Sequence, residues 1–273
     1  MRILLGIVTA TMLAATGAAA EGRLPIFDAH IHYSHDAWEM LPPPQAVEVL
    51  RKAGLKKAFV SSSSDQGTQM LYAEAPDLIV PVLRPYRKRG ELGTWYRDES
   101  VIQLLTERLN ANTYAGIGEF HIYGQDTELP VMRAVVRLAK EHGIFLHLHG
   151  DAEAVDNVFR QNPEARVLWA HSGFDSPANV RAMLDKHQNL WADLAVRGEQ
   201  ATGGKVDPDW RALFEAHPDR IMLGTDTYAP ERWYYVEDHA QWSREWLADL
   251  PPDLAERIAH RNAQTLADWA LKK

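Results

Sequence analysis

The stretch PVMRAVVRLAKEHGIFLHLHG, residues 130–150, contains one complete helix-to-strand unit. Its first part carries apolar residues at helical spacing and stops at Gly143, a residue type that commonly ends helices. The second part, IFLHLHG (144–150), is a short apolar run followed by a turn residue, which is typical of a β-strand. The stretch therefore predicts a helix that leads directly into a strand.

The same alternation of strand and helix recurs along the chain. The candidate strands span residues 24–30, 56–62, 78–84, 115–121, 144–150, 166–171, 190–196 and 220–226. Helical stretches separate them, and one of these opens on the N-cap candidate Ser176. Eight alternations favour a closed parallel barrel over an open doubly wound sheet, and no glycine-rich phosphate fingerprint follows any strand. We predict an α/β fold, a single (β/α)8 TIM barrel.

The first twenty residues, MRILLGIVTATMLAATGAAA, have the features of a secretory signal: an early Arg2, a short apolar run and small residues at the end. We expect a signal peptide over residues 1–20 and the barrel domain over residues 21–273. An uncleaved N-terminal anchor is the alternative. A cleaved chain would be periplasmic or secreted and would have no membrane partner.

Composition narrows the chemistry and the partners. The chain has no cysteine, so disulfides and thiolate chemistry are excluded, and any metal ion must be held by imidazole and carboxylate groups. Its formal net charge of -8 argues against a nucleic-acid partner. The expected partner is a small-molecule substrate, and the sequence leaves open whether the chain forms a homo-oligomer.

Metal-ligating residue types gather where the predicted strands end. In FDAHIHYSHD (27–36), His30 and His32 are separated by one residue, so both side chains leave the same face of a strand. Other strand ends carry Glu119, His121, His147, His149, His171 and Asp226. Each of these has an ordinary structural explanation alone, but together they predict a divalent metal site at the carboxyl-terminal rim. His35 and Asp36 lie past the first strand, and we expect them in a loop.

Five motifs in order, DAHIH, GIGEF, LHLHG, WAHSGF and LGTDT, resemble the amidohydrolase superfamily, in particular its amidohydrolase-related branch of metal-dependent TIM-barrel hydrolases. The resemblance covers nearly the whole chain after residue 20. It implies that His30 and His32 bind the metal, that His149 adds an imidazole, and that Asp226 acts from the eighth strand. It makes His171 either a ligand of a second metal ion or a group that polarises the substrate.

Two positions are left less defined by the resemblance. His149 is nearer the rim than His147 and precedes Gly150, as the family's histidine on this strand often does, so His147 is expected in the barrel interior. Glu119 in GIGEF is similar in position to the bridging glutamate of the TatD-like deoxyribonuclease branch. We therefore expect a site able to bind two ions. If Glu119 instead forms a salt bridge with Arg84 or Arg197, one ion remains. Zinc is the first expectation, with manganese or iron open.

The activity implied by the resemblance is hydrolysis by metal-activated water, with Asp226 as general base. The bond attacked would be an amide, a lactone or other ester, or a phosphoester. The alternatives are a mononuclear nonhydrolytic decarboxylase of the same branch and a non-catalytic metal-binding or ligand-binding barrel.

Two further features concern the substrate and the end of the chain. Arg84 and Arg197 follow predicted strands, where they would bind a carboxylate or phosphate on the substrate or form structural ion pairs. The apolar positions Leu254, Ile258, Leu266 and Trp269 predict that the last helix packs against the barrel of its own chain.

Overall fold

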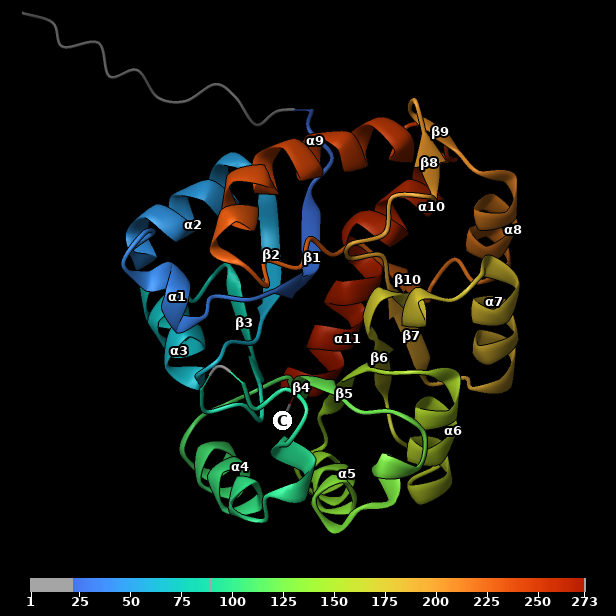
Figure 1. Ribbon diagram of the computed structural model, residues 1–273. Helices are drawn as coiled ribbons and strands as arrows, with labels where there is room; N and C mark the ends of the chain where they lie inside the picture. The colour runs from blue at the N-terminus through green and yellow to red at the C-terminus, as the bar shows by residue number, and fades with distance from the viewer. Residues whose placement is uncertain (1–21, 89, 273) are drawn as a thin grey trace, which may run out of the picture.

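The computed structural model describes residues 22–88 and 90–272 and shows a barrel of parallel strands (Figure 1). Hydrogen-bonded neighbours follow the order β1-β2-β3-β4-β5-β6-β7-β10. The strands are β1 (Ile26–Ile31), β2 (Leu55–Val60), β3 (Ile79–Leu83), β4 (Gly116–His121), β5 (Phe145–His149), β6 (Val167–Trp169), β7 (Leu190–Asp193) and β10 (Ile221–Met222). All eight predicted strands are present, which confirms the (β/α)8 prediction.

Backbone hydrogen bonds between the first and last strands close the ring. The amide of Ala29 donates to the carbonyl of Leu223 at 2.8 Å, and the amide of Asp226 donates to the carbonyl of His30 at 2.7 Å. Gly224 makes this approach possible, because a Cβ atom there would lie 2.9 Å from the Cβ of His30. Closure therefore brings the end of β10 directly beside the histidines of β1.

Most helices surround the strands in chain order, whereas the last helix, drawn in red, crosses the middle of the view (Figure 1). The helices are α1 (His35–Trp38), α2 (Pro43–Lys52), α3 (Asp65–Glu74), α4 (Ser100–Ala111), α5 (Pro130–His142), α6 (Ala152–Gln161), α7 (Pro177–Lys186), α8 (Pro208–Ala216), α9 (Val236–Leu247), α10 (Pro252–Glu256) and α11 (Asn262–Leu271). Helix α5 ends at Gly143 with a left-handed φ of 58°, and the side chain of Ser176 caps α7 by accepting from the amide of Asn179. Both predicted helix signals are confirmed.

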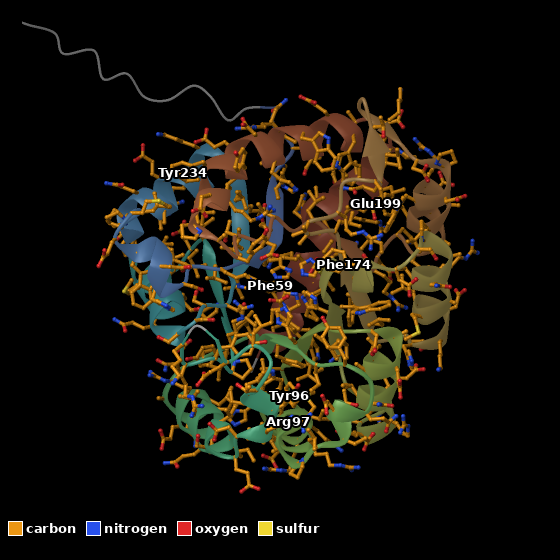
Figure 2. The ribbon with its side chains drawn as sticks, viewed as in Figure 1. Phe59, Tyr96, Arg97, Phe174, Glu199 and Tyr234 are labelled. Atoms are coloured by element: carbon orange, nitrogen blue, oxygen red, sulfur yellow. The ribbon has the colours of Figure 1, made fainter. Side chains whose placement is uncertain are left out.

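The interior of the barrel has an apolar layer below a polar one. On β5, Phe145, His147 and His149 alternate along the strand and so share one face. Phe145 packs against Phe59, which lies near the centre of the molecule in Figure 2, with ring centroids 5.0 Å apart. Helix α11 joins this apolar layer through Leu266 and three alanines. The predicted packing of the last helix within its own chain is confirmed.

Two features were not predicted. A two-stranded hairpin, β8 (Ala201–Thr202) with β9 (Lys205–Val206), interrupts the connection between β7 and α8. A segment of π-helix, Arg257–Arg261, joins α10 to α11. Among the described residues no helix is both long enough and apolar enough to cross a membrane. The predicted signal peptide over residues 1–20 lies outside the described residues.

Candidate metal centre

The carboxyl-terminal ends of the strands bring the predicted ligands together. His30 lies on β1 with His32 just past it, Glu119 on β4 and His149 on β5, while His171 follows β6 and Asp226 follows β10. Ligand atoms of His30, His32 and Asp226 lie within 4.8 Å of one another, and so do those of His30, Glu119 and His171. His30 belongs to both groups, and His149 lies as close to Glu119, so these six residues form one cluster, which we call the histidine cluster.

The side chains of His30 and His32 face each other in an arrangement that a bound cation would stabilise. Their Nε2 atoms are 3.1 Å apart. The Nδ1 of His30 donates to Asp193 at 3.1 Å, and the Nδ1 of His32 donates to the carbonyl of Ser61 at 2.5 Å. In the neutral form each ring therefore points an Nε2 lone pair at the other. A metal ion bound by both lone pairs turns this repulsion into two bonds.

Asp226 supplies a carboxylate to the same point. No residue that the structure describes donates a hydrogen bond to its buried Oδ1, which lies 3.3 Å from Nε2 of His32 and 3.8 Å from Nε2 of His30. A buried carboxylate oxygen without a partner is costly unless a cation completes it. The residues present therefore fit a divalent ion.

Glu119 presents its two oxygens to different groups. Oε1 accepts from Nδ1 of His149 at 2.7 Å and lies 3.4 Å from Nε2 of His171. Oε2 lies 3.2 Å from Nε2 of His32 and forms a buried salt bridge with Arg84 at 2.6 Å. Of the two arginines considered from the sequence, Arg84 is the one that pairs with Glu119. A single metal ion was expected from the sequence if Glu119 formed such a salt bridge.

The charges of the cluster favour a bound cation. Burial disfavours charge on His30, yet the surrounding carboxylates, Asp193 foremost, raise its pKa well above the usual value. Burial and the Arg84 guanidinium lower the pKa of His32. The pKa of Glu119 lies well below its usual range, because the charge of His30 and hydrogen bonds from neighbouring histidines outweigh burial. The carboxylates thus favour positive charge at this point, and a divalent cation that takes the place of the His30 proton would meet a typical donor set of imidazole and carboxylate groups.

Comparison with known proteins gives the family. A family model described as amidohydrolase matches residues 27–266. The chain belongs to the amidohydrolase family. It is an enzyme of the amidohydrolase superfamily, whose members generally depend on divalent metal ions. The predicted family is thereby confirmed. No protein with a curated description matches this amidohydrolase.

Solved structures resemble this amidohydrolase in fold. An uncharacterised TIM-barrel protein of Bordetella bronchiseptica has a TM-score of 0.62 at 15% identity, with 90% of this chain and 99% of that chain covered. A probable 2-pyrone-4,6-dicarboxylic acid hydrolase of Acinetobacter baumannii, with citric acid bound, has a TM-score of 0.58 at 13% identity, with 89% and 98% covered. A Xaa-Pro dipeptidase with bound methionine has a TM-score of 0.56 at 13% identity, with 90% and 75% covered. At these identities the likeness establishes the fold alone.

Two sequence expectations need correction in the amidohydrolase. Arg197 does not reach the histidine cluster with a free guanidinium, because it donates to the carbonyls of His171 at 2.9 Å and Asp175 at 2.8 Å and pairs with Glu199. Arg197 therefore makes structural contacts, which was the alternative to substrate binding. His35 and Asp36 begin helix α1 and are not loop residues. The expectation of a loop was wrong because the helix is only four residues long and has no periodic signal.

A pocket of about 440 Å³ lies at the same end of the barrel. Loops after β1, β2, β3 and β10 form its walls, and Arg84 reaches both this pocket and Glu119. Tyr86, Leu92 and Tyr228 give it apolar surface, and Lys88 has no ion pair among the residues that the structure describes. The pocket combines apolar walls with the basic side chains of Arg84 and Lys88 and the acidic side chain of Asp36, beside the histidine cluster.

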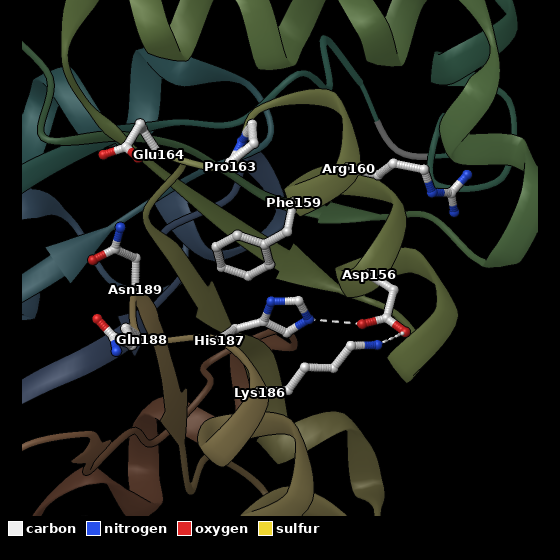
Figure 3. A pocket seen from close by; sticks show the side chains of 9 residues that line it. All are labelled: Asp156, Phe159, Arg160, Pro163, Glu164, Lys186, His187, Gln188 and Asn189. Atoms are coloured by element: carbon white, nitrogen blue, oxygen red, sulfur yellow. Dashed lines mark hydrogen bonds and ion pairs between the residues drawn. The ribbon is translucent and has the colours of Figure 1, made fainter.

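A larger hollow lies elsewhere and has no comparable chemistry (Figure 3). It measures about 750 Å³ and is formed by residues that precede β6 and β7, so it faces the opposite end of the barrel. Three of its titratable groups pair with one another: Lys186 and His187 each contact Asp156 at 2.7 Å. The histidine cluster is therefore the candidate functional site.

Sequence reasoning missed two residues of this site. Asp193 ends β7, is fully buried and contacts both His30 and His147 at 3.1 Å. Tyr86 accepts from the amide of His121 at 2.7 Å and hydrogen-bonds its ring at 2.9 Å. The signal for Asp193 was an acidic residue inside the apolar run LWADLAV (190–196). Tyr86 lies in an irregular loop, where no pattern marks it.

Proposed function

We propose that this amidohydrolase is a secreted metal-dependent hydrolase of a small anionic substrate, with Asp226 as general base. The observation that carries the proposal is the pair of Nε2 atoms of His30 and His32, 3.1 Å apart beside the unpartnered Oδ1 of Asp226. The proposed ligands are His30, His32, Glu119, His171 and Asp226, with His149 hydrogen-bonded to Glu119.

Charge balance favours one divalent ion. The carboxylates of Glu119, Asp193 and Asp226 are buried, and the Arg84 guanidinium offsets one of them. One divalent cation brings this group to neutrality when the histidines are neutral, whereas two leave a surplus of positive charge in a buried site. Zinc suits the imidazole and carboxylate donors best.

A bound divalent ion lowers the pKa of water and polarises an electrophilic carbonyl or phosphoryl group. The chain's own residues supply the remaining steps. Asp226 lies at the rim, where its carboxylate can accept a proton from water and pass it to the leaving group. His171 donates its Nδ1–H to the carbonyl of Ala195 at 2.9 Å, so its Nε2 lone pair is held toward the cluster.

The pocket supports a small anionic substrate. Its volume of about 440 Å³ suits a small molecule. Lys88 and the pocket side of Arg84 can bind a carboxylate or phosphate, while the tyrosine rings pack against an apolar or planar part. The bond attacked is proposed to be an amide, a lactone or other ester, or a phosphoester. Citric acid bound in the Acinetobacter structure supports carboxylate recognition by analogy.

Elemental mass spectrometry combined with a substrate panel tests this proposal. Protein loaded with zinc and dialysed is expected to keep about one equivalent per chain and to hydrolyse a carboxylated amide, lactone or phosphoester. The His30→Ala/His32→Ala variant should lose both the metal and the turnover. His142→Ala changes an unrelated histidine at the end of α5 and should keep both. Full metal content in the double variant refutes the proposal.

A nonhydrolytic decarboxylase with a single ion is the second candidate, and the Arg84–Glu119 salt bridge fits it as well as it fits a one-ion hydrolase. The reaction would break the bond between a carboxylate and its carbon, release carbon dioxide and place a proton on that carbon. Carbon dioxide release from an arylcarboxylate, without incorporation of oxygen from labelled water into the organic product, would establish it over hydrolysis. A non-catalytic binder would retain metal and ligand but turn over neither substrate class.

Secretion rests on the first twenty residues and has its own test. N-terminal sequencing of protein expressed with its leader should find the chain starting at Glu21 in the periplasm or medium. A chain that starts at Met1 and stays with the cells contradicts this part of the proposal.

A further inference from the structure

Asp193 is a buried carboxylate that holds two parts of the histidine cluster. It is the last residue of β7, and its side chain is fully buried. Oδ2 accepts from Nδ1 of His30 at 3.1 Å and from Nε2 of His147 at 3.1 Å. Oδ1 accepts from the backbone amides of His171 at 2.9 Å and Ala195 at 3.0 Å. Four donors therefore fix its position and orientation.

These four bonds make Asp193 a poor metal ligand in its own right. Its ligand atoms do lie within 4.8 Å of those of His30 and His147. However, a carboxylate accepts about one hydrogen bond per lone pair, and all four directions are already used. Its negative charge instead acts on the imidazole of His30, on the side away from the proposed ion.

The hydrogen bonds that Asp193 accepts from the backbone also position a second proposed metal ligand, His171. His171 and Ser172 have left-handed φ values of 56° and 51°, which L-residues avoid at a cost of about 1–2 kcal/mol each. Asp193 anchors the first two residues of this turn, because its Oδ1 accepts from the amide of His171 and its carbonyl accepts from the hydroxyl of Ser172 at 2.7 Å. The turn directs the His171 ring toward Glu119.

We propose that Asp193 is a positioning residue for the metal centre. It keeps the proton of His30 on Nδ1, so that the Nε2 lone pair is available to the ion, and it fixes the turn that carries His171. His147 supports it by donating the second hydrogen bond to Oδ2. The inference rests on the proposed metal centre.

Asp193→Asn changes this arrangement with little change in shape. An asparagine has one oxygen, and the amides of His171 and Ala195 both require an acceptor, so the oxygen stays with them. Its NH2 group then faces Nδ1 of His30, and because NH2 is a donor, Nδ1 must act as the acceptor. The proton of His30 moves to Nε2, where it opposes the metal ion. Zinc affinity should fall about 10- to 100-fold, the range seen when outer partners of metal ligands are removed.

Zinc dissociation constants measured against a chromophoric chelator test the inference, with the absorption spectrum of cobalt-loaded protein as a second readout. Asp65→Asn is the matched control: Asp65 is also buried, and accepts from Tyr114 at 2.7 Å, but it does not contact the histidine cluster. Asp193→Asn should bind zinc weakly and alter the cobalt spectrum, while Asp65→Asn should bind like the wild type. Equal zinc affinity in the wild type and Asp193→Asn overturns the inference alone. Wild-type protein that binds neither metal overturns the proposed function with it.

His147 variants keep the inference testable if Asp193→Asn does not fold. His147→Gln retains an N–H donor for Asp193, whereas His147→Leu removes it. The leucine variant should bind zinc several-fold more weakly than the glutamine variant, in the direction expected for loss of an outer hydrogen bond. Equal affinities of the two variants contradict a role for His147 through Asp193.

Discussion

Replacing Arg84 by methionine tests the charge balance of the histidine cluster. The guanidinium of Arg84 and the carboxylate of Glu119 are 2.6 Å apart, with side chains 7% and 3% exposed. Removing one partner of such a buried pair leaves an uncompensated charge and typically costs about 3–5 kcal/mol. We expect the metal-free variant to lose this much free energy of unfolding, because methionine preserves the packing but not the charge.

A second divalent ion can replace the missing positive charge. The freed Oε2 of Glu119 already lies 3.2 Å from Nε2 of His32. We therefore expect Arg84→Met to bind more zinc than the wild type, approaching two equivalents. Zinc at a hundredfold excess over its Kd should restore about 2.7 kcal/mol, by preferential binding to the folded chain.

Urea unfolding with and without zinc, together with elemental mass spectrometry, measures both effects. Arg97→Met is the control, since Arg97 forms an ion pair with Asp126 in which the side chains are 58% and 37% exposed. Its loss should cost no more than about 1 kcal/mol and leave the metal content unchanged. Arg84→Met that unfolds at the wild-type urea concentration and binds one ion would refute the reasoning.

Three further predictions concern other parts of the molecule. Glu119→Gln should bind at most one equivalent of zinc by elemental analysis. Two equivalents in the wild type and one in Glu119→Gln would instead indicate a pair of ions bridged by Glu119. Burial, with Arg232 nearby, lowers the pKa of His239 to about 4 from 6.5, so unfolding takes up a proton between these values. Stability should therefore fall as pH drops from 6.5 to 4, by up to about 3 kcal/mol, and unfolding of His239→Gln followed over that range should show a weaker fall. Leu266→Ala, in the buried face of α11, should lower the free energy of unfolding in urea by about 2–5 kcal/mol, with zinc content unchanged.

The sequence predicted the barrel because periodicity is a local property. Each strand and helix could be recognised within about ten residues, and chemistry at strand ends follows from parallel topology. The two arginines show where local reasoning stopped. Arg84 follows β3, the neighbour of β4, so adjacency alone places it beside Glu119. Arg197 follows β7, and its guanidinium points back to the carbonyls of His171 and Asp175, which follow β6. The periodicity of helices and strands does not encode this direction.

Asp193 was missed for a related reason. A single acidic residue in an apolar strand predicts a strand end, but not which side chains of other strands donate to it. Its partners His30 and His147 are 163 and 46 residues away in the chain. His147 meets Asp193 from β5 across β6, but only ring closure brings His30 to it, because β7 reaches β1 across β10. Partners that meet through closure of a barrel are therefore the part of such a site least accessible from sequence.

The layered interior explains why charge compensation must come from the rim. Below the histidines, Phe27, Phe59 and Phe145 fill the barrel, and α11 covers them with Leu266 and alanines. No water or counter-ion can approach the buried carboxylates through that apolar layer without opening it. Compensation is left to groups that enter at the carboxyl ends of the strands, and the Arg84 guanidinium neutralises only one of the carboxylates. The remaining negative charge is thus held in place by the fold itself, and it favours a divalent cation at the point where a substrate arrives.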